Sequence, residues 1–455
     1  MATVDSQHAF GRVLATLDDV DLHALSRSLS DELRERKVTF GADDDGEMEA
    51  FVVDPVPRLI ECEEWDALAV GLAQRARALD RFVADVYGGR RIVAAGVVPF
   101  SAIESAEFFE PRMASLPPVS GRWITVTGLD LVRDGEEGPF EVLEDNVRTP
   151  SGIAYAMAAR EALSGHLSVP VGMSVRSLEP AYEWLGEALR AAAPPEAGAS
   201  PSVVVLTDGP SNSAYYEHGA IASRLGLPLV RIDDLTVRSK RLFARTENGL
   251  MPVDVVYRRT DEDRLFDSAG ASTALAEILL GPLEAQTLGC ANAFGTGVAD
   301  DKLVHSYVED MVRFYLDEEP LLRSVPTHDL SKPGVLAMAL ERIGELVVKP
   351  RGGHGGIGVV VGPRADAQTL TAISRELAAA PEQFIVQETV QLSRQPTVCG
   401  EVLEPRHVDL RPFTFAIGDR VEVLPGGLTR VALERGSLVV NSSQRGGAKD
   451  TWVLA

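Results

Sequence analysis

The glycine-rich stretch at residues 346–363, LVVKPRGGHGGIGVVVGP, restricts the possible folds of this chain more than any other feature. Gly353, Gly355 and Gly358 match GxGxxG, but a dinucleotide-binding fingerprint leads into a helix, whereas VVVGP continues as a strand. A protein kinase carries its lysine after the loop, whereas Lys349 precedes it, and HRD, DFG and GK[ST] motifs are absent. We therefore predict two strands joined by a glycine flap, whose backbone N–H groups and basal lysine bind phosphate. The alternative is a merely flexible hairpin.

A second informative strand follows at residues 384–390, FIVQETV. Its apolar half predicts a buried strand, and Gln387 and Glu388 stand where the apolar run stops. An amide and an acid at that position could hydrogen-bond an adenine edge and a ribose hydroxyl. An ordinary strand end explains the same pattern equally well.

Two carboxylates and an amide converge in a predicted β-hairpin over residues 123–146, where WITVTGLDLV and PFEVLED flank the turn DGEEG. Side chains alternate along a strand, so Glu144 and Asn146 share one face, whereas Asp145 points the other way in a structural role. The hairpin brings Asp130 opposite or diagonal to them. Mg²⁺ takes one or two carboxylates together with phosphates and water, so this face is a candidate magnesium site. The alternative is a solvent-exposed polar face.

The acidic composition excludes several classes of partner. The chain has 455 residues and a formal net charge of −23 at pH 7. A surface this acidic repels nucleic acid and anionic lipid, and the apolar runs are too short to span a bilayer, so we expect neither nucleic acid nor membrane as a partner. Cys62, Cys290 and Cys399 are far apart, and no signal peptide is visible, which predicts a reducing, cytoplasmic location.

The order of predicted elements divides the chain into four regions. An acidic, irregular segment covers residues 1–60. A helical region, with a core helix at 61–89, leads into the hairpin within 61–200. After an Ala/Pro/Gly-rich linker, a strand–helix–strand pattern predicts a small parallel sheet within 201–300. The flap belongs to a mixed α and β region over 301–455. We expect two or three cores in an α/β protein.

Together these motifs resemble the circularly permuted ATP-grasp type 2 family, which is related to glutathionylspermidine synthetase-like ligases. The resemblance covers residues 55–455 and rests on LEDNVRTPSG, YRRTDED, FGTGVADDK, VVKPRGGHGGIGVVVGP, RHVDLRPF and LPGGLTRVAL. An ordinary ATP-grasp chain places the flap before the metal hairpin, and this chain has the reverse order. His354 stands where a small residue is common in the family. The resemblance implies a circularly permuted ATP-grasp fold, mixed α/β, with a small parallel-sheet pre-grasp domain.

The resemblance also implies which residues bind ATP and magnesium. Two Mg²⁺ ions would bind Asp130, Glu144 and Asn146. The implied ATP-binding residues are two lysines, four residues of the flap and the polar end of the second strand: Lys302, Lys349, Gly353, His354, Gly355, Gly356, Gln387 and Glu388.

Residues for chemistry and for substrate binding follow from the same resemblance. The γ-phosphate or acyl phosphate would meet Arg411 and Arg430, with Arg148 and Asn441 at the same site. The resemblance also implies which residues of the pre-grasp region face the substrate: Asn212, Ser213, Tyr215, Arg258, Arg259 and Asp261. For Arg258 and Arg259, the alternative is that they form structural ion pairs.

The activity implied by the resemblance is ATP-dependent ligation of a carboxylate to an amine. The carboxylate would become an acyl phosphate, and the amine would then form an amide or peptide bond. The substrates would be small molecules or peptides, while their identity and any homo-oligomer stay open. Two alternatives are an ATP-grasp phosphotransferase that stops at phosphoryl transfer and an ATP-binding partner protein without turnover.

Overall fold

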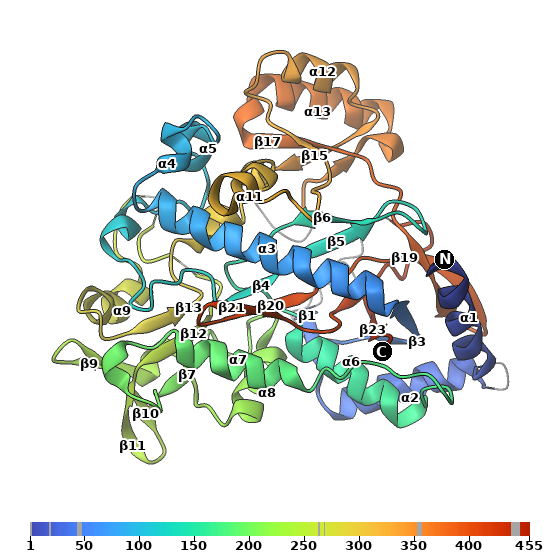
Figure 1. Ribbon diagram of the computed structural model, residues 1–455, viewed down its shortest axis with the longest axis horizontal. Helices are drawn as coiled ribbons and strands as arrows, with labels where there is room; N and C mark the ends of the chain where they lie inside the picture. Colours follow the sequence, from blue (N-terminus) through green and yellow to red (C-terminus); the bar gives the residue numbers. More distant parts are fainter. Residues whose placement is uncertain are drawn as a thin grey trace.

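A long central helix organises the molecule. The computed structural model describes residues 2–17, 20–42, 48–262, 264–267, 269–352, 357–437 and 446–455. Helix α3 (Cys62–Val86) crosses the centre of the view in Figure 1. Trp65, Leu68, Leu72 and Leu79 recur at helical spacing along it, and all four are buried. The core helix predicted at residues 61–89 is therefore confirmed.

The N-terminal region is more regular than the sequence suggested. Leu25, Leu29 and Leu33 lie about one helical turn apart, and each is buried. The prediction of an irregular segment before residue 60 was wrong. Polar residues between these leucines hide the helical spacing of the apolar residues in the sequence. The described residues of this region include the helices α1 (Ala2–Ala15) and α2 (Leu22–Glu35).

A four-stranded parallel sheet occupies the predicted strand–helix–strand region, in the order β13-β12-β7-β8. Its central strands are buried along their whole length, which explains the continuous apolar run SVVVLT. The sheet comprises β7 (Val203–Thr207), β8 (Leu229–Val230), β12 (Val255–Arg259) and β13 (Gly289–Ala291). The helices and antiparallel strands around it are α7 (Pro180–Ala191), α8 (Tyr215–Leu225), α9 (Ala274–Glu284), β9 (Leu235–Arg238), β10 (Arg241–Thr246) and β11 (Gly249–Val253).

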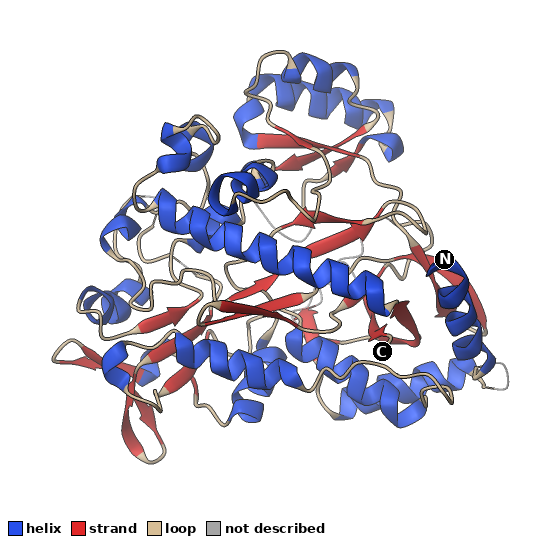
Figure 2. Ribbon diagram, viewed as in Figure 1, coloured by secondary structure: helices blue, strands red, loops and turns tan. Residues whose placement is uncertain are grey.

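The strands on either side of the glycine flap belong to a separate antiparallel sheet, in the order β14-β17-β15-β16. This sheet and two helices form the lobe at the top of Figures 1 and 2, and the two strands predicted beside the glycine run are confirmed. The glycine run itself, at residues 353–356, lies outside the described residues. Leu346, Val348, Leu377 and Val386 make its separate apolar core. The lobe comprises β14 (Thr327–His328), α12 (Val335–Glu341), β15 (Leu346–Pro350), β16 (Val360–Val361), α13 (Ala367–Ala379) and β17 (Phe384–Glu388).

The C-terminal strands pair with strands from the first third of the chain. The hairpin strand β4 pairs with β20, and β23 runs parallel to β3. Such pairing is what a circular permutation of the ATP-grasp order requires. The strands that pair across the two parts of the chain are β3 (Val53–Ile60), β4 (Val126–Gly128), β20 (Phe413–Ile417) and β23 (Gly447–Val453). The strands β21 (Arg420–Val423) and β22 (Thr429–Val431) extend these two sheets, and β5 (Asp130–Arg133) with β6 (Phe140–Glu144) and β18 (Arg394–Cys399) with β19 (Val402–His407) form two further pairs.

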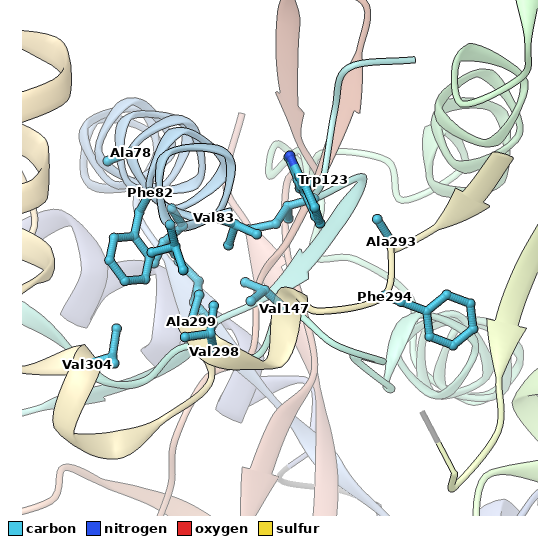
Figure 3. Packing of buried hydrophobic residues seen from close by; sticks show 14 of the residues in the cluster. Ala78, Phe82, Val83, Trp123, Val147, Ala293, Phe294, Val298, Ala299 and Val304 are labelled. Carbon is cyan, nitrogen blue, oxygen red and sulfur yellow. The ribbon is translucent and has the colours of Figure 1, made fainter. Parts of the chain in front are cut away.

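One apolar cluster connects the central helix to the end of the hairpin. Figure 3 shows Phe82 and Val83 of α3 facing Val298 and Ala299, with Val147 beside them. Val147 is fully buried and directly follows the predicted magnesium ligand in the sequence. The cluster therefore fixes the end of the hairpin strand against α3.

The strands β3 and β23 are also joined by a buried ion pair between Asp54 and Lys449. The ammonium group of Lys449 further donates to the carbonyl oxygens of Val56, at 3.1 Å, and Pro396, at 2.8 Å. Both charged side chains are almost fully removed from solvent, and burial lowers the pKa of Lys449. The free-energy cost of burying a charged group is offset only while its oppositely charged partner is present.

We predict that Asp54→Asn lowers the free energy of unfolding by about 3–5 kcal/mol, because the ammonium group stays buried without its counter-charge. Urea denaturation measures the change. The double variant Asp54→Asn/Lys449→Met should recover most of the loss. Asp31→Asn, at the exposed pair with Arg34, is the control and should change the stability by less than about 1 kcal/mol. A cost below about 1 kcal/mol for Asp54→Asn would contradict the role of the pair.

Candidate functional site

A narrow cavity lies where the end of the hairpin meets the flap lobe. Four residues that were predicted for nucleotide and metal binding line it, although they come from distant parts of the chain: Glu144, Lys302, Lys349 and Gln387. The other lining residues are Leu143, Asp145, Asp300, His305, Thr327 and Ile385. Folding therefore gathers polar groups of the hairpin, the DDK motif and the β15–β17 sheet around one space.

The two predicted ATP lysines reach this cavity from different elements. Lys349 lies on β15 with 8% of its side chain exposed, and its Nζ is 3.7 Å from Oε1 of Glu144. Burial lowers the pKa of Lys349, and the neighbouring carboxylate of Glu144 opposes that shift. Lys302 begins α10 (Lys302–His305), and its Nζ is 3.5 Å from the carbonyl oxygen of Arg351 at the base of the flap.

The two polar residues at the end of β17 differ in their surroundings. Gln387 is buried, and its Nε2 donates to Oγ1 of Thr327 at 2.9 Å while the side chain lines the cavity. Glu388 instead accepts from both Nη atoms of Arg342, at 3.0 and 2.9 Å, and contacts Nε2 of His328 at 3.1 Å. Hydrogen bonds from Arg342 are the main cause of the lowered pKa of Glu388. Gln387 therefore faces the cavity, whereas the carboxylate of Glu388 is bound by Arg342 and His328.

Asp130 forms ion pairs with the two arginines that were predicted to contact the reacting phosphate. Its Oδ1 accepts from Nε of Arg411 at 2.5 Å, and its Oδ2 accepts from Nη2 of Arg411 at 2.9 Å and Nη2 of Arg430 at 2.7 Å. Asp409 also binds Arg430, through Nε at 3.0 Å. Burial alone would raise the pKa of Asp130, but the two guanidinium groups lower it to about 2. The cluster therefore combines two carboxylates with two arginines.

The three predicted magnesium ligands fit a metal only in part. Asp130 and Glu144 are paired in the hairpin register, as expected. Three N–H groups already occupy Asp130, which leaves about one of its four lone-pair positions. Asn146 has a buried Nδ2 without a hydrogen-bond partner among the described residues. Across the same residues, no three His, Cys, Asp or Glu side chains form a cluster able to hold a metal ion. The metal assignment therefore stays a prediction.

The two aspartates of the DDK motif join the hairpin to the flap, a role that the sequence interpretation missed. Asp300 accepts from the backbone N–H of Val147 at 2.6 Å and from Nε of Arg148 at 2.8 Å. Asp301 caps α10 and binds Nη2 of Arg351 at 3.0 Å. The signal was present, because acids preceding a helix are typical caps, but only the lysine of the motif was considered.

Arg148, predicted at the reacting phosphate, thus pairs with Asp300 and covers the ring of Phe108, 3.8 Å from its centroid. Asp145 has the structural role that strand alternation predicted. Its carboxylate accepts from Nε and Nη2 of Arg75 on α3, at 2.6 and 2.8 Å, and lies 2.6 Å from Nδ1 of His305. Burial alone would raise the pKa of Asp145, but Arg75 lowers it well below its usual range.

The predicted substrate residues are gathered near the carboxyl ends of β7 and β12. Asn212 donates to Asp208 at 3.2 Å and to Asp261 at 2.8 Å. Ser213 is exposed, and Tyr215 begins α8. These residues occupy the edge of a parallel sheet where ligands commonly bind.

The two arginines of YRRTDED are buried in this region. Arg259 pairs with Glu217 at 3.1 Å and donates to the carbonyl oxygen of Pro150 at 2.8 Å. The guanidinium group of Arg258 lies 4.5 Å from the ring centroid of Phe294. The structural ion pair that was the alternative for Arg259 is therefore present. The remaining predicted site residues, Gly353, His354, Gly355, Gly356 and Asn441, lie outside the described residues.

A family model for circularly permuted ATP-grasp type 2 proteins matches residues 57–432. The chain belongs to this family. A glutathione synthetase-like effector from Globodera pallida, solved in its apo form, aligns with a TM-score of 0.61 over 95% of this chain and 97% of that one. Its sequence identity is 12%, so the likeness concerns the fold alone. The predicted ATP-grasp fold is confirmed.

Relatives extend across several bacteria. An uncharacterized protein of Synechocystis sp. is 44% identical over 417 residues, covering 90% of this chain and 86% of that protein. An uncharacterized protein of Mycobacterium leprae is 41% identical over 446 residues, covering 97% and 79%. A Frankia casuarinae protein, provisionally named a glutamate–cysteine ligase, is 44% identical over 427 residues, which cover 93% of this chain and 49% of that protein.

The ATP-grasp family and the ligase name of the Frankia protein support an ATP-dependent ligase in general terms. This chain spans about half the length of that protein. The activity in the name therefore need not reside in the shared half. Within the described ranges, every helix is too short or too polar to cross a bilayer.

The Asp130 cluster gives a testable prediction about this ATP-grasp site. In Asp130→Asn, Arg411 and Arg430 lose a shared counter-charge, so inorganic tripolyphosphate should bind at least about fivefold more tightly in the presence of EDTA. A unit charge about 4 Å away contributes roughly 1–4 kcal/mol. Isothermal titration calorimetry measures the affinity, and Glu136→Gln in the exposed hairpin turn is the control. Unchanged or weaker binding would show that Asp130 does not neutralise the arginines.

Proposed function

We propose that this chain is an ATP-dependent carboxylate–amine ligase that forms an amide or peptide bond through an acyl phosphate. The observation that carries the proposal is the convergence of Lys302, Lys349 and Gln387 with Glu144 around one cavity. Cations for a triphosphate, an amide for a base and an acid for a metal are the groups that such chemistry needs.

The residues have distinct roles in the proposed reaction. Lys302 and Lys349 neutralise phosphate oxygens, and Gln387 orients the base. Magnesium, when bound by Glu144, Asn146 and the free lone pair of Asp130, would offset charge on the phosphates. Phosphoryl transfer depends mainly on positioning and charge neutralisation, so no covalent nucleophile is required.

The arginine cluster would act on the product of phosphoryl transfer. The substrate carboxylate attacks the γ-phosphorus, which gives an acyl phosphate and ADP. An amine then attacks the acyl carbon, and phosphate leaves while the amine loses a proton. Arg411 and Arg430 stabilise the oxyanion and the departing phosphate. We place the acceptor beside Asn212 and Asp261, where β7 and β12 end.

The proposed chemistry predicts products that depend on both substrates. ADP and inorganic phosphate should be released in equal amounts only when a carboxylate and an amine are both present, and coupled assays with panels of amino acids, short peptides and polyamines measure them. ADP formation with a phosphorylated product and no free phosphate would indicate a phosphotransferase. Nucleotide binding without ADP from any substrate pair would contradict both enzymatic functions and favour a binding protein.

The metal assignment predicts the effect of a paired substitution. Glu144→Gln combined with Asn146→Ala should reduce ATP turnover by at least about a hundredfold, because both proposed oxygen ligands are weakened or lost. Glu136→Gln, in the hairpin turn at an exposed ion pair with Arg394, is the matched control and should keep full activity. Turnover that survives the paired substitution would refute the metal site.

A further inference from the structure

A three-stranded antiparallel ribbon at the edge of the molecule takes no part in the proposed reaction. It consists of β9, β10 and β11, in the order β11-β10-β9, and lies beyond the parallel sheet in Figure 1. Its inward face packs on the main apolar core through Leu242, Ala244 and Val253, each of which is buried. The ribbon is therefore an integral part of the fold, and its other face turns to solvent.

The strand register defines the residues of that outward face. Arg241 stands directly opposite Arg238, and Arg245 stands opposite Leu250. Residues that oppose each other across an antiparallel pair share a face, as do residues two positions apart on one strand. We call this surface the arginine face, and its members are Thr236, Arg238, Arg241, Phe243, Arg245, Leu250 and Pro252.

The three arginines of the arginine face are exposed and have no counter-charge among the described residues. Other exposed arginines, such as Arg34, Arg313 and Arg420, each form an ion pair with an acid. Like charges that oppose each other on neighbouring strands destabilise a sheet, so Arg238 beside Arg241 costs stability in the free chain. Carboxylates supplied by another molecule would offset this cost.

The turn between the two opposed arginines is held in a fixed conformation. Ser239 and Lys240 have φ angles of 50° and 62°, which is the left-handed region that favours glycine. The hydroxyl group of Thr287 donates to the carbonyl oxygen of Lys240 at 2.7 Å. Because the turn is anchored in this way, the arginines are presented on a rigid platform, which reduces the entropy lost on binding.

The composition of the arginine face indicates the chemistry of its partner. Arginine and aromatic side chains are enriched in protein–protein interfaces, whereas affinity for nucleic acid comes mainly from cations that contact many phosphates. Phe243, Leu250 and Pro252 lie among the arginines and offer apolar surface that a phosphate backbone cannot cover. A second copy that docked symmetrically through the same face would set arginines against arginines. The complementary surface is therefore acidic and partly apolar.

We propose that the arginine face is a docking site for an acidic segment of a partner protein. Carboxylates of that segment pair with the three arginines, and its apolar side chains cover Phe243 and Leu250. Salt screens charges more than about 8 Å apart, so the face attracts carboxylates locally although the whole chain carries a net charge of −23.

The probe for this site is a synthetic peptide in which glutamates alternate with leucines, and fluorescence anisotropy with the full chain measures its affinity. Poly-glutamate with the same number of carboxylates should bind at least about threefold more weakly, because it cannot cover the apolar groups. In Arg238→Glu/Arg241→Glu/Arg245→Glu, the peptide should bind at least about tenfold more weakly, because attractive charge pairs become repulsive.

A matched control carries the same change of net charge at exposed arginines that already have acidic partners. Arg34→Glu/Arg313→Glu/Arg420→Glu should change the affinity for the peptide by less than about threefold, since salt screens distant charges. An equal loss of affinity in the control would show that only the overall charge of the chain matters, which would contradict the proposal.

The stability of the free chain gives a second readout. Arg238→Thr should raise the urea midpoint, because it removes one of two opposed like charges, and should also weaken binding of the peptide. Arg245→Thr makes the same change of residue opposite Leu250 and should raise the midpoint less. A lower midpoint in Arg238→Thr would contradict the cost assigned to the opposed pair.

Three further outcomes would overturn the proposal. A duplex DNA oligonucleotide that binds as tightly as the peptide, and is lost in the same triple variant, would show a site for any polyanion. A dimer of the natural chain in analytical ultracentrifugation that the triple substitution dissociates would show that a second copy covers the face. Unchanged peptide affinity in the folded triple variant, or in Arg238→Thr where the triple variant does not fold, would place the acidic segment elsewhere.

Discussion

The arrangement of the candidate site depends on the hydrogen bonds and ion pairs of two adjacent aspartates, Asp300 and Asp301. One binds the backbone of Val147 at the end of the hairpin, and the other binds Arg351 at the base of the flap. Two parts of the candidate site that lie far apart in the sequence are thereby held together by neighbouring residues. Lys302 follows directly, so its ammonium group enters the cavity at the junction of the two parts.

Charge is concentrated in this site in the form of paired groups. Asp130 and Asp409 face Arg411 and Arg430, and Arg75 faces Asp145. Removing one member of a buried pair leaves an uncompensated charge, so each pair constrains the geometry of its partners. In a chain with a net charge of −23, these arginines are thus neutralised locally by the carboxylates that contact them.

The sequence predicted the elements of the site better than their contacts. The strand lysine Lys349, the apolar-to-polar switch at Gln387 and the acidic strand end at Glu144 follow local rules of strands. The structure brings these three residues to one cavity. The helices before residue 60 were missed because polar residues stand between their leucines and hide the helical spacing. The ion pair of Arg259 with Glu217 was one of two readings that the sequence left open.

The sequence by itself determined the family and the two strands beside the glycine run, because these depend on local geometry and residue type. Only the tertiary structure decided which charges meet. It joined Asp130 to two C-terminal arginines, Asp301 to Arg351, and Asp145 to His305. Such pairs form between residues distant along the chain, and their desolvation and distance are set by the packing of whole elements rather than by neighbouring residues.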